Sequence, residues 1–305
     1  KDGFSNGVIF EKCFLLGILG ISFIINGGIN MDECRLCPRE CLVNRLAGEV
    51  GYCGCGDEMV IARYSLHKWE EPCISGPNGS GTIFFSYCNM KCIFCQNYDI
   101  STLHKGRVVS VCEFSNICLE LEQKGASNIN LVTGVMYIPL IVEGIKLARS
   151  HGLSIPIVYN SSGYERVNAL KELEGIVDIY LPDLKYYDND LALKYSKCSD
   201  YFKYASLAIE EMYRQVGKVK FSSDGLILRG VIVRHLILPG SILDSKMIIK
   251  YLYQSYGDNI FISIMNQYTP LPQVADIEAL NRTETPEEYR SEEHTSELQS
   301  LAMIS

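Results

Sequence analysis

Three cysteines within eight residues stand out in the stretch FFSYCNMKCIFCQN, residues 84–97. Cys88, Cys92 and Cys95 have the spacing C-x3-C-x2-C and follow a run of β-type residues directly. A disulfide would use two of these thiols and leave one reactive, and structural zinc would need a fourth ligand that does not follow Cys95 closely. Three thiolates suit a cubane iron–sulfur cluster, which has four irons and normally takes four cysteines. One iron would then remain open to another ligand.

A second set of cysteines lies nearer the amino terminus. Cys34, Cys37, Cys41 and Cys53 have the spacing C-x2-C-x3-C-x11-C. Four thiols at this spacing suit a structural zinc ion or a second iron–sulfur cluster, and free buried thiols are the remaining interpretation. The segment around them shows little hydrophobic periodicity, so it needs a metal or another cross-link to fold. Spacing alone does not distinguish zinc from a cluster.

Composition narrows the class of protein. The chain has 305 residues, 13 cysteines and a formal net charge of −8. An odd, clustered set of cysteines argues against a secreted disulfide framework, so we expect a cytoplasmic protein. No cluster of Lys and Arg stands out, which argues against nucleic acid as a partner, and we expect no membrane partner. The neighbouring charges Glu70 and Glu71 are expected to belong to an exposed surface run.

The segments that must position Cys88, Cys92 and Cys95 are predicted to be alternating strands and helices. Apolar, β-branched runs predict strands buried on both faces. They cover residues 81–86, 128–133, 155–160, 177–183, 230–239 and 260–267. Between them, helices are expected before Gly125, Gly152 and Gly217, the last with Leu207, Met212 and Val216 on its apolar face. The alternation predicts parallel strands with right-handed crossovers, and an open doubly wound sheet is the alternative.

The cysteine loop resembles that of the radical S-adenosylmethionine (SAM) superfamily, whose signature has this spacing with an aromatic residue, here Phe94, before the last cysteine. The resemblance implies a six-stranded (β/α)6 partial TIM barrel, an α/β fold with the cluster loop after the first strand. A closer similarity is to the branch of pyruvate formate-lyase activating enzymes, within a poorly characterised activase-like group. It rests on the stretches CRLCPREC, HKWEEPCISG, CNMKCIFCQN, YNSSGYE, VDIYLPDLKY, MYRQVG and RHLILPG.

The superfamily resemblance implies a [4Fe–4S] cluster on Cys88, Cys92 and Cys95 and SAM on the open iron. Reductive cleavage of SAM would give a 5′-deoxyadenosyl radical that abstracts hydrogen. The implied partners are an electron donor such as flavodoxin or ferredoxin and, for an activase, a glycyl-radical protein. The alternatives are a radical SAM oxidoreductase acting on a small molecule and a non-catalytic metal-binding scaffold.

In a β/α barrel, ligands gather at the carboxyl ends of the strands, so we expect SAM contacts there. The resemblance places Phe94 against the adenine. Thr133 and Gly134 follow the second strand, where the family expects a segment near the SAM amino group. Asn160 and Ser162 follow the third strand and are candidates for contacts to ribose or carboxylate, with a Ser/Gly turn as the alternative.

Charged residues follow the later strands. Lys185 is a candidate to neutralise the SAM carboxylate, and Asp183 to orient it or bind a cation, with a strand-end ion pair as the alternative. Arg234 and His235 interrupt an otherwise apolar strand and are further candidates for cofactor binding. Because adjacent strand residues point in opposite directions, at most one of them faces the barrel interior unless a bulge intervenes.

Four segments are expected along the chain. Residues 1–30 precede the first methionine and are interpreted as upstream translation, with a membrane anchor as the alternative. Residues 31–80 form the cysteine-rich module and residues 81–280 the barrel. Residues 281–305 are interpreted as a truncated end followed by an adapter-derived tail.

Overall fold

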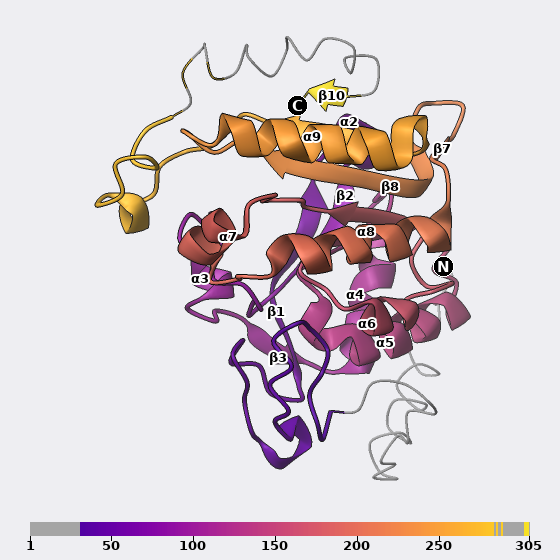
Figure 1. Ribbon diagram of the computed structural model, residues 1–305. Helices are drawn as coiled ribbons and strands as arrows, with labels where there is room; N and C mark the ends of the chain where they lie inside the picture. Colours follow the sequence, from indigo (N-terminus) through magenta and orange to yellow (C-terminus); the bar gives the residue numbers. More distant parts are fainter. Residues whose placement is uncertain (1–30, 284, 286–287, 289–301, 305) are drawn as a thin grey trace.

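A curved sheet with helices packed on its outer face forms the protein (Figure 1). The computed structural model describes residues 31–283, 285, 288 and 302–304. Six of its strands are parallel and adjacent in chain order, and they match the six predicted runs. They are β2 (Ser80–Phe85), β4 (Ile129–Val132), β5 (Ile157–Ser161), β6 (Ile179–Pro182), β8 (Ile227–Leu236) and β9 (Phe261–Met265).

The barrel is partial because other strands occupy its two edges. β1 (Met59–His67) pairs antiparallel with β2, and β3 (Arg107–Val109) pairs with β1. At the other edge β10 (Ala302–Ile304) pairs parallel with β9, and the short β7 (Lys220–Phe221) pairs with β8. Within the described residues β2 and β9 are therefore not joined. The prediction of a parallel partial barrel is confirmed, and β1 continues its sheet into residues 31–80.

The helices of the outer layer follow the strands in the expected order. They are α4 (Val111–Gln123), α5 (Ile138–Ser150), α6 (Val167–Lys171), α7 (Asn189–Ser196), α8 (Tyr201–Val216) and α9 (Ile242–Tyr256). Gly125, Gly152 and Gly217 have positive φ at the ends of α4, α5 and α8, as the sequence predicts. One helix-face prediction is wrong: Leu207 is 43% exposed. The buried stripe of α8 runs through Ala205, Ala208, Ile209 and Met212 instead.

Two apolar layers lie on the two faces of the sheet. The outer and larger one joins Ile83, Leu131 and Tyr180 of the strands to the helices. The inner one joins Val158, Leu181 and other strand residues to Cys73 and Ile74 of α2 (Pro72–Ser75). The α2 segment is attached at the amino-terminal end of β4, because Asn128 Nδ2 donates to the carbonyl of Ile74 at 2.7 Å. The barrel interior is thus closed at one end, and the carboxyl ends of the strands face the other.

Two expectations lie wholly or largely outside the described residues. These are the upstream origin of residues 1–30 and the adapter origin of the tail. Among the residues that the structure does describe, no helix has the length and apolar character required to cross a bilayer.

Candidate active site

The cysteine loop after β2 has a strongly bent backbone held by its neighbours. Tyr87 and Lys91 both have positive φ, 72° and 80°, which is uncommon for residues with a Cβ. Asn89 is fully buried and donates to the carbonyl of Tyr164 at 2.7 Å, and Ile93 N donates to the carbonyl of Tyr195 at 2.9 Å. These bonds attach the loop to segments that follow β5 and β6. A strained backbone of this kind persists only where surrounding contacts hold it, and it is often found at functional sites.

The thiols of this loop are free and surrounded by polar donors. Cys92 Sγ accepts from Ser196 Oγ at 2.9 Å, and Cys95 Sγ accepts from Ser101 Oγ at 3.3 Å. Burial raises the pKa of Cys92, while the Lys185 ammonium acts in the opposite direction. A buried thiol with a raised pKa becomes a thiolate, the form that ligates iron, when a cation compensates its charge.

The donor set fits three-point attachment of a cluster. Burial raises the pKa of Cys88, and the nearby sulfur atoms of Cys92 and Cys95 raise it further, which shows that the three side chains share one environment. In the described residues no three ligating side chains are already arranged around one metal position. All three thiols belong to one loop of eight residues, so a cluster would have to draw together side chains of a single short segment.

A buried charge network lies at the carboxyl ends of β5, β6 and β8. Arg234 donates from Nε to Asp183 Oδ1 at 3.0 Å and from Nη2 to Asn160 Oδ1 at 2.6 Å. Its Nη1 donates to Glu70 Oε2 at 3.2 Å, and Lys185 Nζ donates to Asp183 Oδ2 at 2.6 Å. Sequence analysis placed Glu70 and its neighbour on the surface, which is wrong: the side chain of Glu70 is 9% exposed.

The two cations of the network have different roles. Arg234 has partners at each of its three nitrogens, so it connects three strand ends to Glu70. Asp183 is the acceptor of Lys185 among the described residues, and an ammonium has three donors, so Lys185 retains donors for a ligand. Burial alone would raise the pKa of Asp183, but the charges of Arg234 and Lys185 outweigh burial and hold that pKa below its usual value.

The inner face of the barrel also carries buried polar atoms without hydrogen-bond partners. Asn130 is fully buried, and neither its Oδ1 nor its Nδ2 has a partner; the same holds for Ser263 Oγ and Glu71 Oε2. Ile129 and Leu131 face the outer layer, so Asn130 between them faces the interior. Ser263 pairs with Arg234 across β8 and β9. Because such groups are costly to bury alone, this interior suits a polar ligand or ordered water.

The turns after β4 and β5 are tightly packed. Thr133 has φ 62°, unusual for a β-branched residue, and its N–H donates to the carbonyl of Asn160 at 2.9 Å. Gly134 packs so closely that an added Cβ would lie 2.7 Å from Ile141 Cδ1. The carbonyl of Ser162 accepts from the Tyr201 hydroxyl at 2.8 Å. These contacts place the backbone of both turns beside the network without assigning a ligand to the Thr133 or Ser162 side chain.

Two further predicted residues lie away from the network. His235 is on the opposite face of β8 from Arg234, where Nδ1 lies 2.8 Å from the carbonyl of Leu184 and Nε2 lies 2.8 Å from Ser245 Oγ. Burial lowers its pKa to about 4, so it is a neutral core histidine. This placement does not bring His235 to the candidate site. Phe94 is buried and packs edge-on against Tyr268, with ring centroids 6.3 Å apart.

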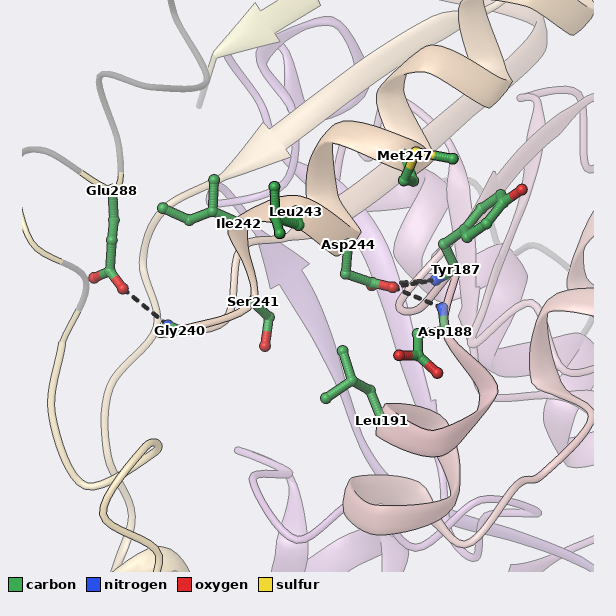
Figure 2. A pocket seen from close by; sticks show the side chains of 10 residues that line it. All are labelled: Tyr187, Asp188, Leu191, Gly240, Ser241, Ile242, Leu243, Asp244, Met247 and Glu288. Atoms are coloured by element: carbon green, nitrogen blue, oxygen red, sulfur yellow. Dashed lines mark hydrogen bonds between the residues drawn. The ribbon is translucent and has the colours of Figure 1, made fainter.

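A hollow of about 660 Å³ lies between the loops after β6 and β8 (Figure 2). The apolar side chains of Leu191, Ile242, Leu243 and Met247 line it, and Leu243 is 79% exposed. Asp244 joins its two walls by accepting from the backbone N–H groups of Tyr187 and Asp188. Periodicity did not reveal this hollow, because it depends on two helix starts that lie far apart in the sequence.

The sequence of this chain is similar to a known protein family and to a protein of another organism. Residues 82–236, just over half of the chain, match the family model described as the radical SAM superfamily. The uncharacterized protein MJ0674 of Methanocaldococcus jannaschii is 29% identical over an alignment that covers 89% of this chain and 76% of that protein.

Solved structures give weaker similarities. SuiB of Streptococcus suis bound to S-adenosylmethionine has a TM-score of 0.47 at 11% identity, covering 72% of this chain and 47% of SuiB. A domain of a pyruvate-formate lyase-activating enzyme from Bacteroides vulgatus has a TM-score of 0.40 at 15% identity, covering 56% of this chain and 92% of that domain. The chain corresponds to less than half the length of SuiB, and neither likeness supports an argument about function.

Proposed function

The chain belongs to the radical SAM superfamily, and we propose that within it the protein is an activating enzyme that abstracts hydrogen from a glycyl-radical protein. The observation that carries radical SAM chemistry is the cysteine loop beside a buried charge network. Lys185 belongs to that network and influences the pKa of Cys92. The family and this arrangement support an enzyme over a non-catalytic scaffold.

The cofactor supplies the chemistry that the side chains lack. Cys88, Cys92 and Cys95 would hold a [4Fe–4S] cluster, which would supply an open iron for SAM and the electron for reductive cleavage of its sulfonium bond. Lys185 would neutralise the SAM carboxylate, a role that its remaining donors beside Asp183 support. Asp183 orients Lys185, and Arg234 fixes the strand ends around it. The backbone after β4, bent at Thr133, offers carbonyls to an ammonium group.

The open hollow at the carboxyl ends of the strands favours an activase over a radical SAM enzyme that acts on a small molecule. An activase must admit a segment of another protein. The hollow of about 660 Å³ lies among the loops that follow β6 and β8, and its apolar wall includes the exposed Leu243. Association with another protein surface would cover such residues. We also infer a cytoplasmic location and a low-potential electron donor such as flavodoxin or ferredoxin, since the cluster must be reduced for each cleavage.

Anaerobic reconstitution with iron and sulfide tests the reaction directly. After reduction with dithionite, we expect the protein to convert SAM into methionine and 5′-deoxyadenosine, measured by chromatography. The Cys92→Ala variant is expected to show only the background rate, because it removes a ligand of the cluster. Cys118→Ala is the matched control, since Cys118 is buried in α4 within the outer apolar layer.

The subtype needs a second measurement. With a candidate protein substrate whose glycines carry deuterium at Cα, an activase is expected to transfer one deuterium into 5′-deoxyadenosine, because its radical abstracts that hydrogen and leaves a glycyl radical. Retention of SAM cleavage by Cys92→Ala would refute the cluster assignment. Cleavage accompanied by deuterium transfer from a small metabolite would instead refute the activase proposal and leave the superfamily chemistry intact.

A further inference from the structure

The amino-terminal cysteine set surrounds a cavity of its own. A small space of about 20 Å³ is lined by Cys34, Cys37, Cys41 and Cys53, together with Cys55 and several other residues. All five thiols are free. Because they line the same small space, the side chains of Cys34, Cys37, Cys41 and Cys53 share one environment.

The backbone around this cavity is folded tightly about the sulfur atoms. Cys34 N donates to the carbonyl of Val43 at 3.0 Å, and Leu42 N donates back to the carbonyl of Cys34 at 3.1 Å. Tyr52 N donates to Cys41 Sγ at 3.3 Å. Gly51 passes so close that an added Cβ would lie 2.7 Å from Cys41 Sγ. The chain reversal that brings Cys53 back to the first three cysteines therefore depends on a residue without a side chain.

The size of the cavity and the donor chemistry favour a single ion. A space of about 20 Å³ holds roughly one water-sized sphere. Zinc binds four cysteine sulfurs at about 2.3 Å in a tetrahedron, so one ion fills a space of that order, whereas a four-iron cluster is much larger. Cys55 is engaged elsewhere, since its sulfur accepts from Arg45 Nη2 at 3.3 Å. Four sulfurs thus remain for one ion; among the described residues they are not arranged around one position, so the ion would have to draw them together.

The residues between these cysteines contact both loops of the candidate active site. Tyr52 donates from its hydroxyl to the carbonyl of Met90 at 3.2 Å, and Arg39 Nε donates to the carbonyl of Asn89 at 3.0 Å. The Arg39 guanidinium lies 3.9 Å from the centre of the Tyr52 ring. Arg45 is 1% exposed and donates to the carbonyl of Met136, after β4, at 2.8 Å.

We propose that Cys34, Cys37, Cys41 and Cys53 bind one zinc ion, and that this ion fixes Arg39, Arg45 and Tyr52 against the cysteine loop and the turn after β4. The zinc site goes beyond the proposed function and does not depend on it. The second part, that the zinc ion helps to position the cysteine loop after β2, rests on the proposed function, because it is tested by measuring SAM binding.

The metal content of the 305-residue chain, purified without oxygen, tests the zinc site. We expect one zinc per chain by mass spectrometry, retained in Cys92→Ala and in the control Cys118→Ser. The double variant C37S/C41S is expected to lose that zinc. Growth with cobalt is expected to give the visible bands of a tetrahedral cobalt thiolate in wild type and Cys92→Ala. Zinc retained by C37S/C41S would overturn the proposal. If C37S/C41S lost iron and no zinc, these cysteines would hold a second iron–sulfur cluster, and the proposal would also be overturned.

A second variant keeps the positioning role testable if C37S/C41S does not fold. Tyr52→Phe removes the hydroxyl that donates to Met90 and leaves the cysteines in place. We expect it to retain zinc and cluster iron, and to weaken SAM binding about 3-fold to 10-fold, the loss of one hydrogen bond. The readout is the change that SAM causes in the electron paramagnetic resonance spectrum of the reduced cluster. An unchanged SAM titration would overturn the positioning role even if SAM cleavage itself is absent in every variant.

Discussion

At the scale of single residues, the two buried cations of the candidate site differ in how many hydrogen-bond donors they still have for a ligand. Arg234 is shared among Asp183, Glu70 and Asn160, whereas Lys185 is held by Asp183 and keeps donors. Breaking a buried ion pair leaves an unpaired charge and destabilises a protein by about 3–5 kcal/mol. Substitution at Arg234 is therefore expected to affect folding, and substitution at Lys185 to affect ligand binding more directly.

Replacing Lys185 by Met tests this distinction. We expect the dissociation constant for SAM to rise about 10-fold to 100-fold, which corresponds to the loss of a charge-assisted hydrogen bond. Cluster iron should be retained, since no cysteine is changed. Equilibrium binding on the reconstituted, unreduced protein measures the effect, with Lys146→Met, on the exposed face of α5, as the control. Equal SAM affinity of the two variants would remove Lys185 from the cofactor site.

At the scale of elements, the ends of neighbouring strands are held close together by small residues. Gly163, after β5, has φ 76°, and an added Cβ would lie 2.3 Å from the carbonyl oxygen of Asp183 after β6. That oxygen belongs to the same residue that pairs with Lys185 and Arg234. A side chain at position 163 would therefore push the two strand ends apart within the charge network.

Gly163→Ala and Gly175→Ala form a matched pair for this contact. Both glycines have φ +76°, but a Cβ at Gly175 would meet nothing within 4 Å. The strained backbone should cost each variant about 1 kcal/mol, and the clash should add a further cost of about 1–3 kcal/mol at Gly163 alone. Chemical unfolding measures the difference, and SAM cleavage should fall only in Gly163→Ala. Equal stability of the two variants would show that the strand ends have room to move.

At the scale of the whole molecule, a buried carboxyl group connects stability to pH. Glu165 is 1% exposed and accepts from the Tyr159 hydroxyl through both oxygens at 3.1 Å. Burial raises its pKa to about 7. An unfolded chain releases this proton near the ordinary pKa of about 4.3, so the folded state binds the proton more tightly. The stability that this group contributes is present in acid and is lost as the pH rises toward 7.

Glu165→Gln is expected to remove this part of the pH dependence. Wild type should lose about 3 kcal/mol of unfolding free energy as the pH rises from about 4.5 to about 7, an effect of the order set by proton linkage. The Gln side chain stays neutral, so the variant should lack that decline. Unfolding in urea between pH 5 and pH 8 measures the difference between the two proteins. Parallel curves would show that Glu165 ionises normally in the folded state.

The sequence predicted local features well where one short pattern carries the information. The three cysteines of the loop, the six parallel strands and the ends of α4 and α5 at Gly125 and Gly152 follow from spacing and periodicity. Leu207 shows a limit of such patterns, because it was predicted on the buried face of α8 and is exposed. Which face of a helix is buried depends on the elements that pack against it. Glu70 shows another limit: two adjacent glutamates suggest a surface charge run until the partner of Glu70, Arg234, which lies 164 residues away, is known.

By itself, the sequence determined the chemistry available to this protein: three thiols on one loop, four more in a second set, and alternating strands and helices to support them. Thiol spacing and hydrophobic period are local properties, so they can be read along the chain. Tertiary structure alone decided that Arg234 faces inward and His235 outward, that Glu70 enters the barrel, and that the second cysteine set contacts the loop of the first. Those relations arise between segments far apart in sequence, where packing and burial, rather than spacing, choose the partner of each charge.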